Sequence, residues 1–361
     1  MKKILYIITK GTWGGAQTYV SNLIHDQVKR KNEIYLVTGS TGKLTTDVQK
    51  ILPAENIYIV NSLENKIGVN LLNATHNVRK IIKKINPDII HLNSTVAGLV
   101  GRLANIGINN KIIYTVHGSS FTPGLSKKRI VAGMFLEKVL LPLTDDIIFV
   151  SNFDFNLWVK KGIINKNFSK GHVIYNGVFD RKRVVSNNNK NKFIITMAAR
   201  FSSQKYQELL IKAVKKVNNP NLHVIFLGNG DSYLMQCKRL VKANDLENNI
   251  QFLGNVDDVI PYYEQSDVVA LISHYEGLPI SLIEALSLGL PLIASNVGGV
   301  SELFENNGFC ISNDVDILKN AIIQMMNNKN ELKTLGRNSR KLFEKKYTEL
   351  KMLNETNNLY K

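Results

Sequence analysis

Apolar residues along the chain gather in short runs, and longer stretches with helical spacing separate these runs. The runs of the first half are rich in β-branched residues and almost continuously apolar, which is typical of parallel strands buried on both faces. They are Lys3–Thr9, Glu33–Val37, Ile57–Val60, Asp88–Leu92, Lys111–Val116, Ile147–Val150 and His172–Tyr175. Between them lie helix-length segments such as Ala16–Lys29, Leu71–Ile85 and Lys128–Leu140. This alternation predicts a doubly wound α/β domain.

The same alternation resumes after the polar stretch DRKRVVSNNNKNK, residues 180–192, which we interpret as a linker. Further strand-like runs follow it: Phe193–Met197, His223–Leu227, Ile250–Leu253, Val268–Leu271 and Pro291–Ala294. We therefore expect two Rossmann-like domains facing across a cleft, at residues 1–180 and 181–345. A C-terminal helix at 346–361 is expected to pack back toward the first domain. Ligands of such sheets bind in the loops that follow the strands.

Composition places the chain among ordinary globular proteins and adds one anomaly, its charge. The 361 residues are 44% hydrophobic and 21% charged, which excludes a disordered protein. The formal net charge is +17, and residues 1–180 carry 23 Lys and Arg against 11 Asp and Glu. Such a molecule attracts anions. Nucleic acid, anionic lipid, nucleotides and phosphorylated substrates all remain open at this point.

The chain has no apolar run of the roughly 20 residues that a membrane-spanning helix needs. The apolar stretch behind Lys2 and Lys3 has only strand length, so no secretory signal is predicted. Residues 125–143 mix cations with apolar residues at helical spacing, which is typical of a membrane-surface helix or of a core helix with a solvated basic edge. Arg79, Lys80, Lys83 and Lys84 form a second basic stretch. We expect a cytoplasmic protein at the inner face of the membrane.

The strongest chemical signal is the segment HYEGLPISLIEALSLG, residues 274–289. Pro279 suits the first turn of a helix and Gly289 its C-terminal end. Glu276 then lies in the loop before the helix N-terminus, where free N–H groups favour phosphate. Glu284 can point back at the same ligand, and vicinal hydroxyls would satisfy a partly buried carboxylate. The alternative is that Glu276 only complements the helix dipole and that Glu284 is a solvated helix residue. The Gly-Leu-Pro sequence between them disfavours this alternative.

A second signal is the pair of cations in AARFSSQK, Arg200 and Lys205. They follow a predicted strand and precede a helix expected from Gln204. Arg200 through its planar fork and Lys205 as a point charge could neutralise a diphosphate. Two unrelated surface cations are the alternative.

The first half offers a glycine-rich loop and a histidine. Gly11-Thr12-Trp13-Gly14-Gly15 follows the first strand, and its glycines permit close approach to a ligand. Its spacing is not the dinucleotide fingerprint, and a tight turn remains the alternative for Gly11. His117 ends the strand Lys111–Val116 and faces the predicted cleft, a usual place for a polar site group.

Two further loops and one acidic motif complete the candidates. Gly228 and Asn229 follow one strand of the second half and Val256 follows the next, so these loops could contact a nucleoside base or be plain turns. The letters Asp314-Val315-Asp316 match a metal-binding DxD motif, but their place at the start of a helix predicts a cap. Without a His or Cys cluster of metal-ligand spacing, we expect no metal and no cofactor.

Together these residues resemble the retaining GT-B glycosyltransferases of the GT4 group, the glycosyl transferases group 1 of bacterial surface-polysaccharide synthesis. The resemblance covers the layout of the whole chain and is most specific at Arg200, Lys205 and the Glu276–Glu284 pair; Ala199 stands where many relatives have Gly. It implies a metal-independent, hexosyltransferase-type enzyme. Its donor would be a nucleotide-diphosphate sugar, by expectation linked to UDP. Its acceptor would be a glycan or a lipid-diphosphate-linked glycan of capsule, O-antigen or lipopolysaccharide.

The resemblance also implies a role for each residue. Arg200 and Lys205 would hold the diphosphate and stabilise it as it leaves, while Glu276 would contact sugar hydroxyls. Glu284 would bind the ribose, and His117 would contact the sugar near the reacting carbon. The backbone groups that would lie against the donor belong to Gly14, Gly15, Gly277, Leu278 and Pro279.

The chemistry agrees, because preorganised cations and a helix N-terminus stabilise a leaving diphosphate. A sugar-nucleotide epimerase of the same fold is one alternative, and the Glu276–Glu284 helix argues against it. A basic nucleic-acid-binding protein is another, which would interleave aromatic residues with its cations. The neighbours of Lys80–Lys84 and Lys127–Arg129 are mainly aliphatic, so this alternative is the weaker one.

Overall fold

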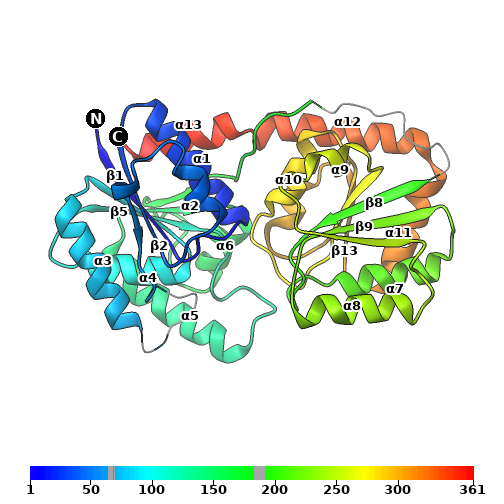
Figure 1. The fold of residues 1–361 in the computed structure, drawn as a ribbon, viewed down its shortest axis with the longest axis horizontal. Helices are drawn as coiled ribbons and strands as arrows, with labels where there is room; N and C mark the ends of the chain where they lie inside the picture. Colours follow the sequence, from blue (N-terminus) through cyan, green and yellow to red (C-terminus); the bar gives the residue numbers. More distant parts are fainter. Residues whose placement is uncertain (64–67, 69, 183–191) are drawn as a thin grey trace. The chain divides into compact units, whose positions relative to one another are not determined.

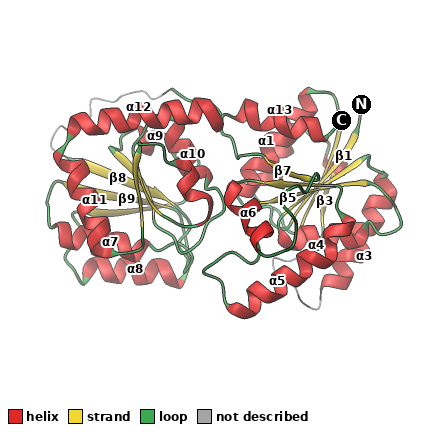
Figure 2. Ribbon diagram, turned by 180° about the vertical axis from the view of Figure 1, so that it is seen from behind, coloured by secondary structure: helices red, strands yellow, loops and turns green. Residues whose placement is uncertain are grey.

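The computed structural model describes residues 1–63, 68, 70–182 and 192–361. They form two compact units: unit 1 comprises Met1–Asn176 and Leu350–Lys361, and unit 2 comprises Gly177–Glu349. Both are α/β units, and helices cover both faces of each sheet (Figures 1 and 2). Of the predicted linker, residues 183–191 lie outside the described residues.

Unit 1 contains a seven-stranded parallel sheet of order β3-β2-β1-β4-β5-β6-β7. Its strands are β1 (Lys3–Ile8), β2 (Glu33–Thr38), β3 (Ile57–Ile59), β4 (Ile89–Asn93), β5 (Lys111–Val116), β6 (Asp146–Phe149) and β7 (Gly171–Val173). Its helices are α1 (Gly15–Lys29), α2 (Lys43–Val48), α3 (Leu71–Ile85), α4 (Thr95–Ala104), α5 (Lys127–Leu140), α6 (Asn152–Lys160) and α13 (Glu349–Leu359). The strand order reverses between β1 and β4, which makes their carboxyl ends the expected ligand-binding edge.

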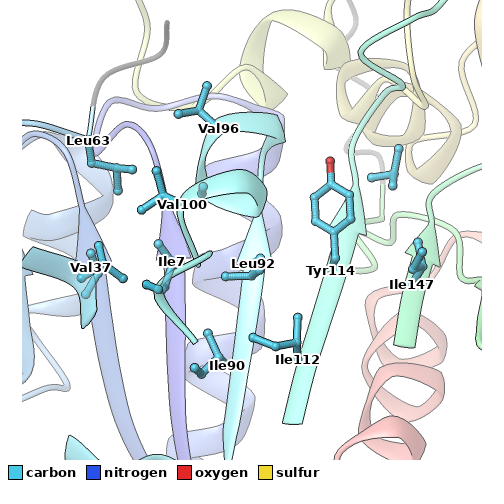
Figure 3. Close-up of a cluster of buried hydrophobic side chains, with 14 of the residues drawn as sticks. Ile7, Val37, Leu63, Ile90, Leu92, Val96, Val100, Ile112, Tyr114 and Ile147 are labelled. Carbon is cyan, nitrogen blue, oxygen red and sulfur yellow. The ribbon is translucent and has the colours of Figure 1, made fainter. Parts of the chain in front are cut away.

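Side chains along the strands of this sheet point alternately to its two faces and belong to two apolar cores, one on each face. Residues such as Ile7, Val37 and Leu92 pack on one face against α3, α4, α5 and α6, as the close-up in Figure 3 shows in part. The opposite face packs against α1, α2 and α13, and Met352 and Leu353 belong to that second core.

Unit 2 contains a six-stranded parallel sheet of order β10-β9-β8-β11-β12-β13. Its strands are β8 (Phe193–Ala198), β9 (Leu222–Leu227), β10 (Ile250–Gly254), β11 (Val268–Leu271), β12 (Leu292–Ser295) and β13 (Gly308–Ile311). Its helices are α7 (Gln207–Val217), α8 (Ser232–Lys242), α9 (Ile260–Glu264), α10 (Ile280–Ser287), α11 (Val315–Asn327) and α12 (Lys329–Lys346). Here the order reverses between β8 and β11.

The predicted strands are present, and their ends agree with the predicted ones to within two residues. The edge strand β13 was not predicted, because it is short, starts at a glycine and is only half-buried over most of its length. The helix expected from Gln204 begins at Gln207 instead. Within the described ranges, every helix is too short or too polar to cross a membrane.

Candidate active site

The switch point of unit 2 brings together the two strongest sequence signals. The loop after β8 carries Arg200 and Lys205, and the loop after the adjacent strand β11 carries Glu276. Parallel sheets bind ligands at this position because two loops there diverge to opposite faces of the sheet. The topology therefore places the basic pair and the first glutamate at one sheet edge.

Backbone pairing joins these two loops directly. The Tyr206 N–H donates to the Ile272 carbonyl at 2.9 Å, and the His274 N–H donates to the Gln204 carbonyl at 2.8 Å. Between them, Lys205 and Ser273 form an antiparallel bridge. Because residues 204–206 take part in this pairing, they cannot also form helix, which corrects the predicted start of α7.

The pairing sets Lys205 against Glu276. The Lys205 ammonium forms an ion pair and a hydrogen bond with Glu276 Oε1, and the Ser273 hydroxyl donates to the same oxygen at 2.6 Å. The two charged side chains are only 16% and 7% exposed. A charge so deeply buried needs such partners. Arg200 is exposed, and its guanidinium has no ion pair or hydrogen bond within the described ranges.

The Glu276 loop is braced from the loop after β12. Gly298 has φ +57°, and a Cβ there would lie 1.9 Å from the Glu276 carbonyl oxygen, so only glycine fits. The Gly299 N–H donates to the Gly277 carbonyl at 3.0 Å. Sequence reasoning missed Ser273 and Gly298. The Gly298-Gly299 pair follows a predicted strand, and this pattern could have indicated the contact with the Glu276 loop. No sequence pattern pointed to Ser273.

Helix α10 follows this loop. Pro279 is its N-cap, and Gly289, with φ +65°, lies just beyond its end. The helix boundaries predicted from these two residues are therefore confirmed to within a residue. Glu284 is half-buried, and its carboxylate has no hydrogen bond in the part of the chain that the structure describes. Burial raises its pKa to about 7, with repulsion from Asp258 adding to the shift and Arg181 opposing it. A carboxylate in this position lacks hydrogen-bond donors, which hydroxyl groups could supply.

The loops after β9 and β10 reach the same edge. Gly228 has φ +132°, and a Cβ there would lie 2.3 Å from the Ala199 carbonyl oxygen, so the loop passes close to Arg200. The Phe201 N–H donates to the Asn229 carbonyl at 2.8 Å. Val256, in the loop after β10, is half-buried. The glycine at position 228 thus has a structural reason of its own.

In unit 1 the glycine-rich loop follows β1 at the switch point. A Cβ on Gly11 would lie 2.1 Å from the Ser40 carbonyl oxygen in the loop after β2, so the close packing of these two loops requires glycine at this position. Gly14, the N-cap of α1, is extended, and a Cβ there would meet only the end of the Gln17 side chain. Neither packing nor backbone conformation therefore demands a glycine at 14. Gly15 is the first residue of α1.

His117 directly follows β5 and is half-buried. Its Nε2 lies 3.0 Å from Asn93 Oδ1, at the end of β4, and its ring meets the Tyr19 ring edge-on with centroids 4.9 Å apart. Burial lowers the pKa of His117 to about 3, so the imidazole is neutral near pH 7. Asn93 had no sequence signal, since its partner lies on another strand.

Asp314 is the N-cap of α11 and accepts the N–H groups of Asp316 and Ile317, which confirms the predicted cap. Among residues 1–63, 68, 70–182 and 192–361, His, Cys, Asp and Glu side chains form no group of three or more that could hold a metal ion.

Comparison with known proteins identifies the family. Residues 178–342 match the model of Glycosyl transferases group 1, and residues 13–181 match that of Glycosyltransferase Family 4. Over 320 residues the chain is 33% identical to the O-antigen biosynthesis glycosyltransferase WbnH of Escherichia coli, covering 88% of each protein. The chain belongs to the group 1, family 4 glycosyltransferases.

Other members of this family extend the comparison. This glycosyltransferase is 27% identical to UDP-Gal:alpha-D-GlcNAc-diphosphoundecaprenol alpha-1,3-galactosyltransferase of Escherichia coli over 347 residues, covering 91% of this chain and 88% of that protein. The crystal structure of Anabaena HepE in complex with UDP-glucose superposes with a TM-score of 0.83 at 20% identity, over 100% and 99% of the two chains. That likeness shows the GT-B fold.

Proposed function

We propose that this glycosyltransferase moves a sugar from a UDP-linked donor to a lipid-diphosphate-linked glycan in surface-polysaccharide assembly, with retention of configuration. The observation that carries the donor assignment is the cluster at the switch point of unit 2. There Lys205 pairs with Glu276 in front of α10, Arg200 is exposed, and Glu284 lacks a hydrogen-bond partner within the described residues. The names of its relatives support the partners: one uses UDP-Gal and a diphosphoundecaprenol acceptor, and HepE was crystallised with UDP-glucose.

In this proposal the cluster binds the donor along its length, from the diphosphate at Arg200 and Lys205 to the ribose at Glu284. Arg200 and Lys205 neutralise the diphosphate as it leaves, and they do so without a metal. The backbone at Gly277 and Leu278 and the N-terminus of α10 face the same negative charge. Glu276 accepts from sugar hydroxyls, and the two ribose hydroxyls supply the donors that the Glu284 carboxylate lacks.

For unit 1 the family resemblance implies roles of His117 and of the Gly14-Gly15 loop. His117 contacts the donor sugar near the reacting carbon, and the missing side chain at Gly14 lets the loop backbone approach the diphosphate. For retention, the acceptor hydroxyl attacks from the face that the diphosphate leaves. The bond from the anomeric carbon to the diphosphate oxygen breaks, the bond to the acceptor oxygen forms, and the diphosphate oxygen takes the acceptor proton.

The outer face of α5 supports a membrane-bound acceptor. Val131, Phe135 and Val139, spaced four residues apart, form one apolar stripe and are 67%, 71% and 55% exposed. The acid of this helix, Glu137, is buried and ion-paired with buried Arg102 at 2.9 Å. The exposed charged residues of α5 are therefore all cations: Lys127, Lys128, Arg129 and Lys138. An apolar stripe flanked by cations fits the surface of an anionic bilayer.

Thermal denaturation with nucleotide diphosphates and nucleotide sugars tests the donor assignment, because a ligand that binds the native state raises the melting temperature. We expect UDP-sugars to stabilise the protein and uridine to have little effect. A transfer assay with a diphosphate-linked lipid acceptor then tests the reaction. Absence of stabilisation by every nucleotide sugar would refute the proposal.

A further inference from the structure

A column of polar side chains crosses the apolar second core of unit 1. The Tyr360 hydroxyl lies 2.6 Å from His91 Nδ1, and His91 Nε2 lies 2.7 Å from the Thr115 hydroxyl. His91 and Thr115 are fully buried on the strands β4 and β5. Asn93 lies two residues beyond His91 on β4 and so shares its face, and His117, directly after β5, meets Asn93 and continues this column toward the carboxyl edge of the sheet.

The hydrogen bonds at the end of the column fix the orientation of Asn93. Its Nδ2 donates to the His91 backbone carbonyl at 3.2 Å, so its Oδ1 is the atom that lies 3.0 Å from His117 Nε2. A flipped amide would set two oxygens against each other. Since an amide oxygen only accepts, His117 Nε2 must carry the hydrogen.

The other ring nitrogen then follows by elimination. A neutral imidazole has one N–H, so Nδ1 of His117 holds a lone pair. Within the described parts of the chain, this nitrogen makes no hydrogen bond. The ring is only half-buried, which leaves Nδ1 available to a ligand.

We propose that Asn93 is a positioning residue, which holds His117 as the Nε2–H tautomer so that Nδ1 accepts a hydrogen bond from a hydroxyl group of the donor sugar. This inference rests on the proposed contact between His117 and the donor. The titratable groups that face His117 are Tyr19 from α1 and His91 from β4. Burial raises the pKa of Tyr19 and lowers that of His91 to about 3, so neither brings a charge near neutral pH.

Nitrogen-15 NMR of histidine-labelled protein tests the tautomer without any assay of activity. We expect the His117 signals of a protonated Nε2 and an unprotonated Nδ1, assigned by their loss in His117→Ala. In Asn93→Ala we expect a mixture of tautomers. A protonated Nδ1 in the unmodified protein would overturn the inference, even if the protein transfers sugar as proposed.

Kinetics of two Asn93 variants separate positioning from a structural role. Asn93→Ala should lower kcat/KM about tenfold at every pH, the effect of one orienting hydrogen bond. Asn93→Asp still accepts from Nε2, but its carboxylate raises the pKa of His117. Its activity should therefore approach that of the unmodified enzyme at pH 8 and fall toward pH 6, where Nδ1 gains a proton, while the unmodified enzyme changes little.

Equal losses in both variants at every pH would overturn the inference, provided circular dichroism shows folded protein. If Asn93→Asp fails to fold, the NMR experiment still decides. If the tautomer is as expected but no nucleotide sugar binds, the proposed function fails and the assignment of the His117 tautomer stands.

Discussion

The Lys205 ammonium is ion-paired with the Glu276 carboxylate, although the proposed function requires it to bind a diphosphate. The second partner of this carboxylate, the Ser273 hydroxyl, remains with it when the ammonium turns to another anion. If Lys205 binds a diphosphate as proposed, Glu276 therefore keeps one hydrogen-bond partner, which lowers the desolvation cost of binding.

We predict that Lys205→Ala lowers the transfer rate by about 100- to 1000-fold, the usual effect of removing a group that stabilises charge in the transition state. The fold should persist, because Ser273 still donates to Glu276. Lys216→Ala is the matched control, since this exposed lysine of α7 pairs only with Asp316 among the described residues. Steady-state kinetics of both variants check the prediction, and near-normal transfer by Lys205→Ala would contradict the site.

The buried carboxyl group of Glu284 makes the stability of the fold depend on pH. Because its folded-state pKa is raised from 4.5 to about 7, the proton it binds stabilises the fold below pH 4.5, and that contribution is lost as the pH rises through 7. We predict that Glu284→Gln is more stable than the unmodified protein at pH 8 by up to roughly 3 kcal/mol, with little difference at pH 4. The same variant should bind UDP weakly.

Urea denaturation at the two pH values measures this difference. Glu247→Gln, at an exposed position of the same unit, serves as the control. Equal stability of Glu284→Gln and the unmodified protein at pH 8 would contradict the prediction.

At the scale of elements, α5 shows how one buried contact decides what a helix presents. Arg102 from α4 draws Glu137 inward, and the Tyr114 hydroxyl donates to the same carboxylate at 3.2 Å. Because Glu137 is ion-paired in the core, the exposed charged residues of α5 are all cations, and they flank the apolar stripe Val131, Phe135 and Val139. Lys80, Lys83 and Lys84 of α3, which packs on the same face of the sheet, add to this positive surface.

We predict that the double substitution Val131→Ser and Phe135→Ser weakens binding to anionic phospholipid vesicles tenfold or more, roughly the effect of losing two apolar side chains from the interface. Raising the ionic strength should weaken binding further. Leu350→Ser, which removes an equally exposed apolar side chain from α13, is the control. Vesicle co-sedimentation measures both, and unchanged binding of the double variant would exclude α5 as the docking face.

At the scale of the molecule, unit 1 is built from two stretches that are far apart in the sequence. Residues 350–361 supply Met352 and Leu353 to its second core and Tyr360 to its polar column. Lys111 Nζ also donates to the Leu359 carbonyl at 2.7 Å. The last helix is therefore part of the first unit's fold.

We predict that a variant ending at residue 349 lowers the melting temperature of unit 1 by about 10 °C or more, since each buried Leu or Met contributes about 2 kcal/mol or more. Differential scanning calorimetry should show the transition of unit 2 largely unchanged. Asn354→Ala, at an exposed position of the same helix, should leave both transitions in place. A full-length-like transition in the truncated protein would contradict this dependence.

Much of this architecture follows from local patterns. The continuously apolar runs predicted the strands, because residues buried on both faces must be apolar whatever their neighbours are. Pro279 and Gly289 bounded α10, since their backbone restrictions act within one helical turn. The edge strand β13 was not predicted, because a half-buried strand need not be a continuous run of apolar residues.

The sequence by itself determined the two α/β units and the residue types at their carboxyl edges. Only the tertiary structure decided the partners: Lys205 with Glu276, Asn93 with His117, Arg102 with Glu137 and Tyr360 with His91. Strand periods and helix ends depend on interactions between near neighbours in the chain. Side-chain partners depend on strand order and register, which join residues that lie tens to hundreds of positions apart.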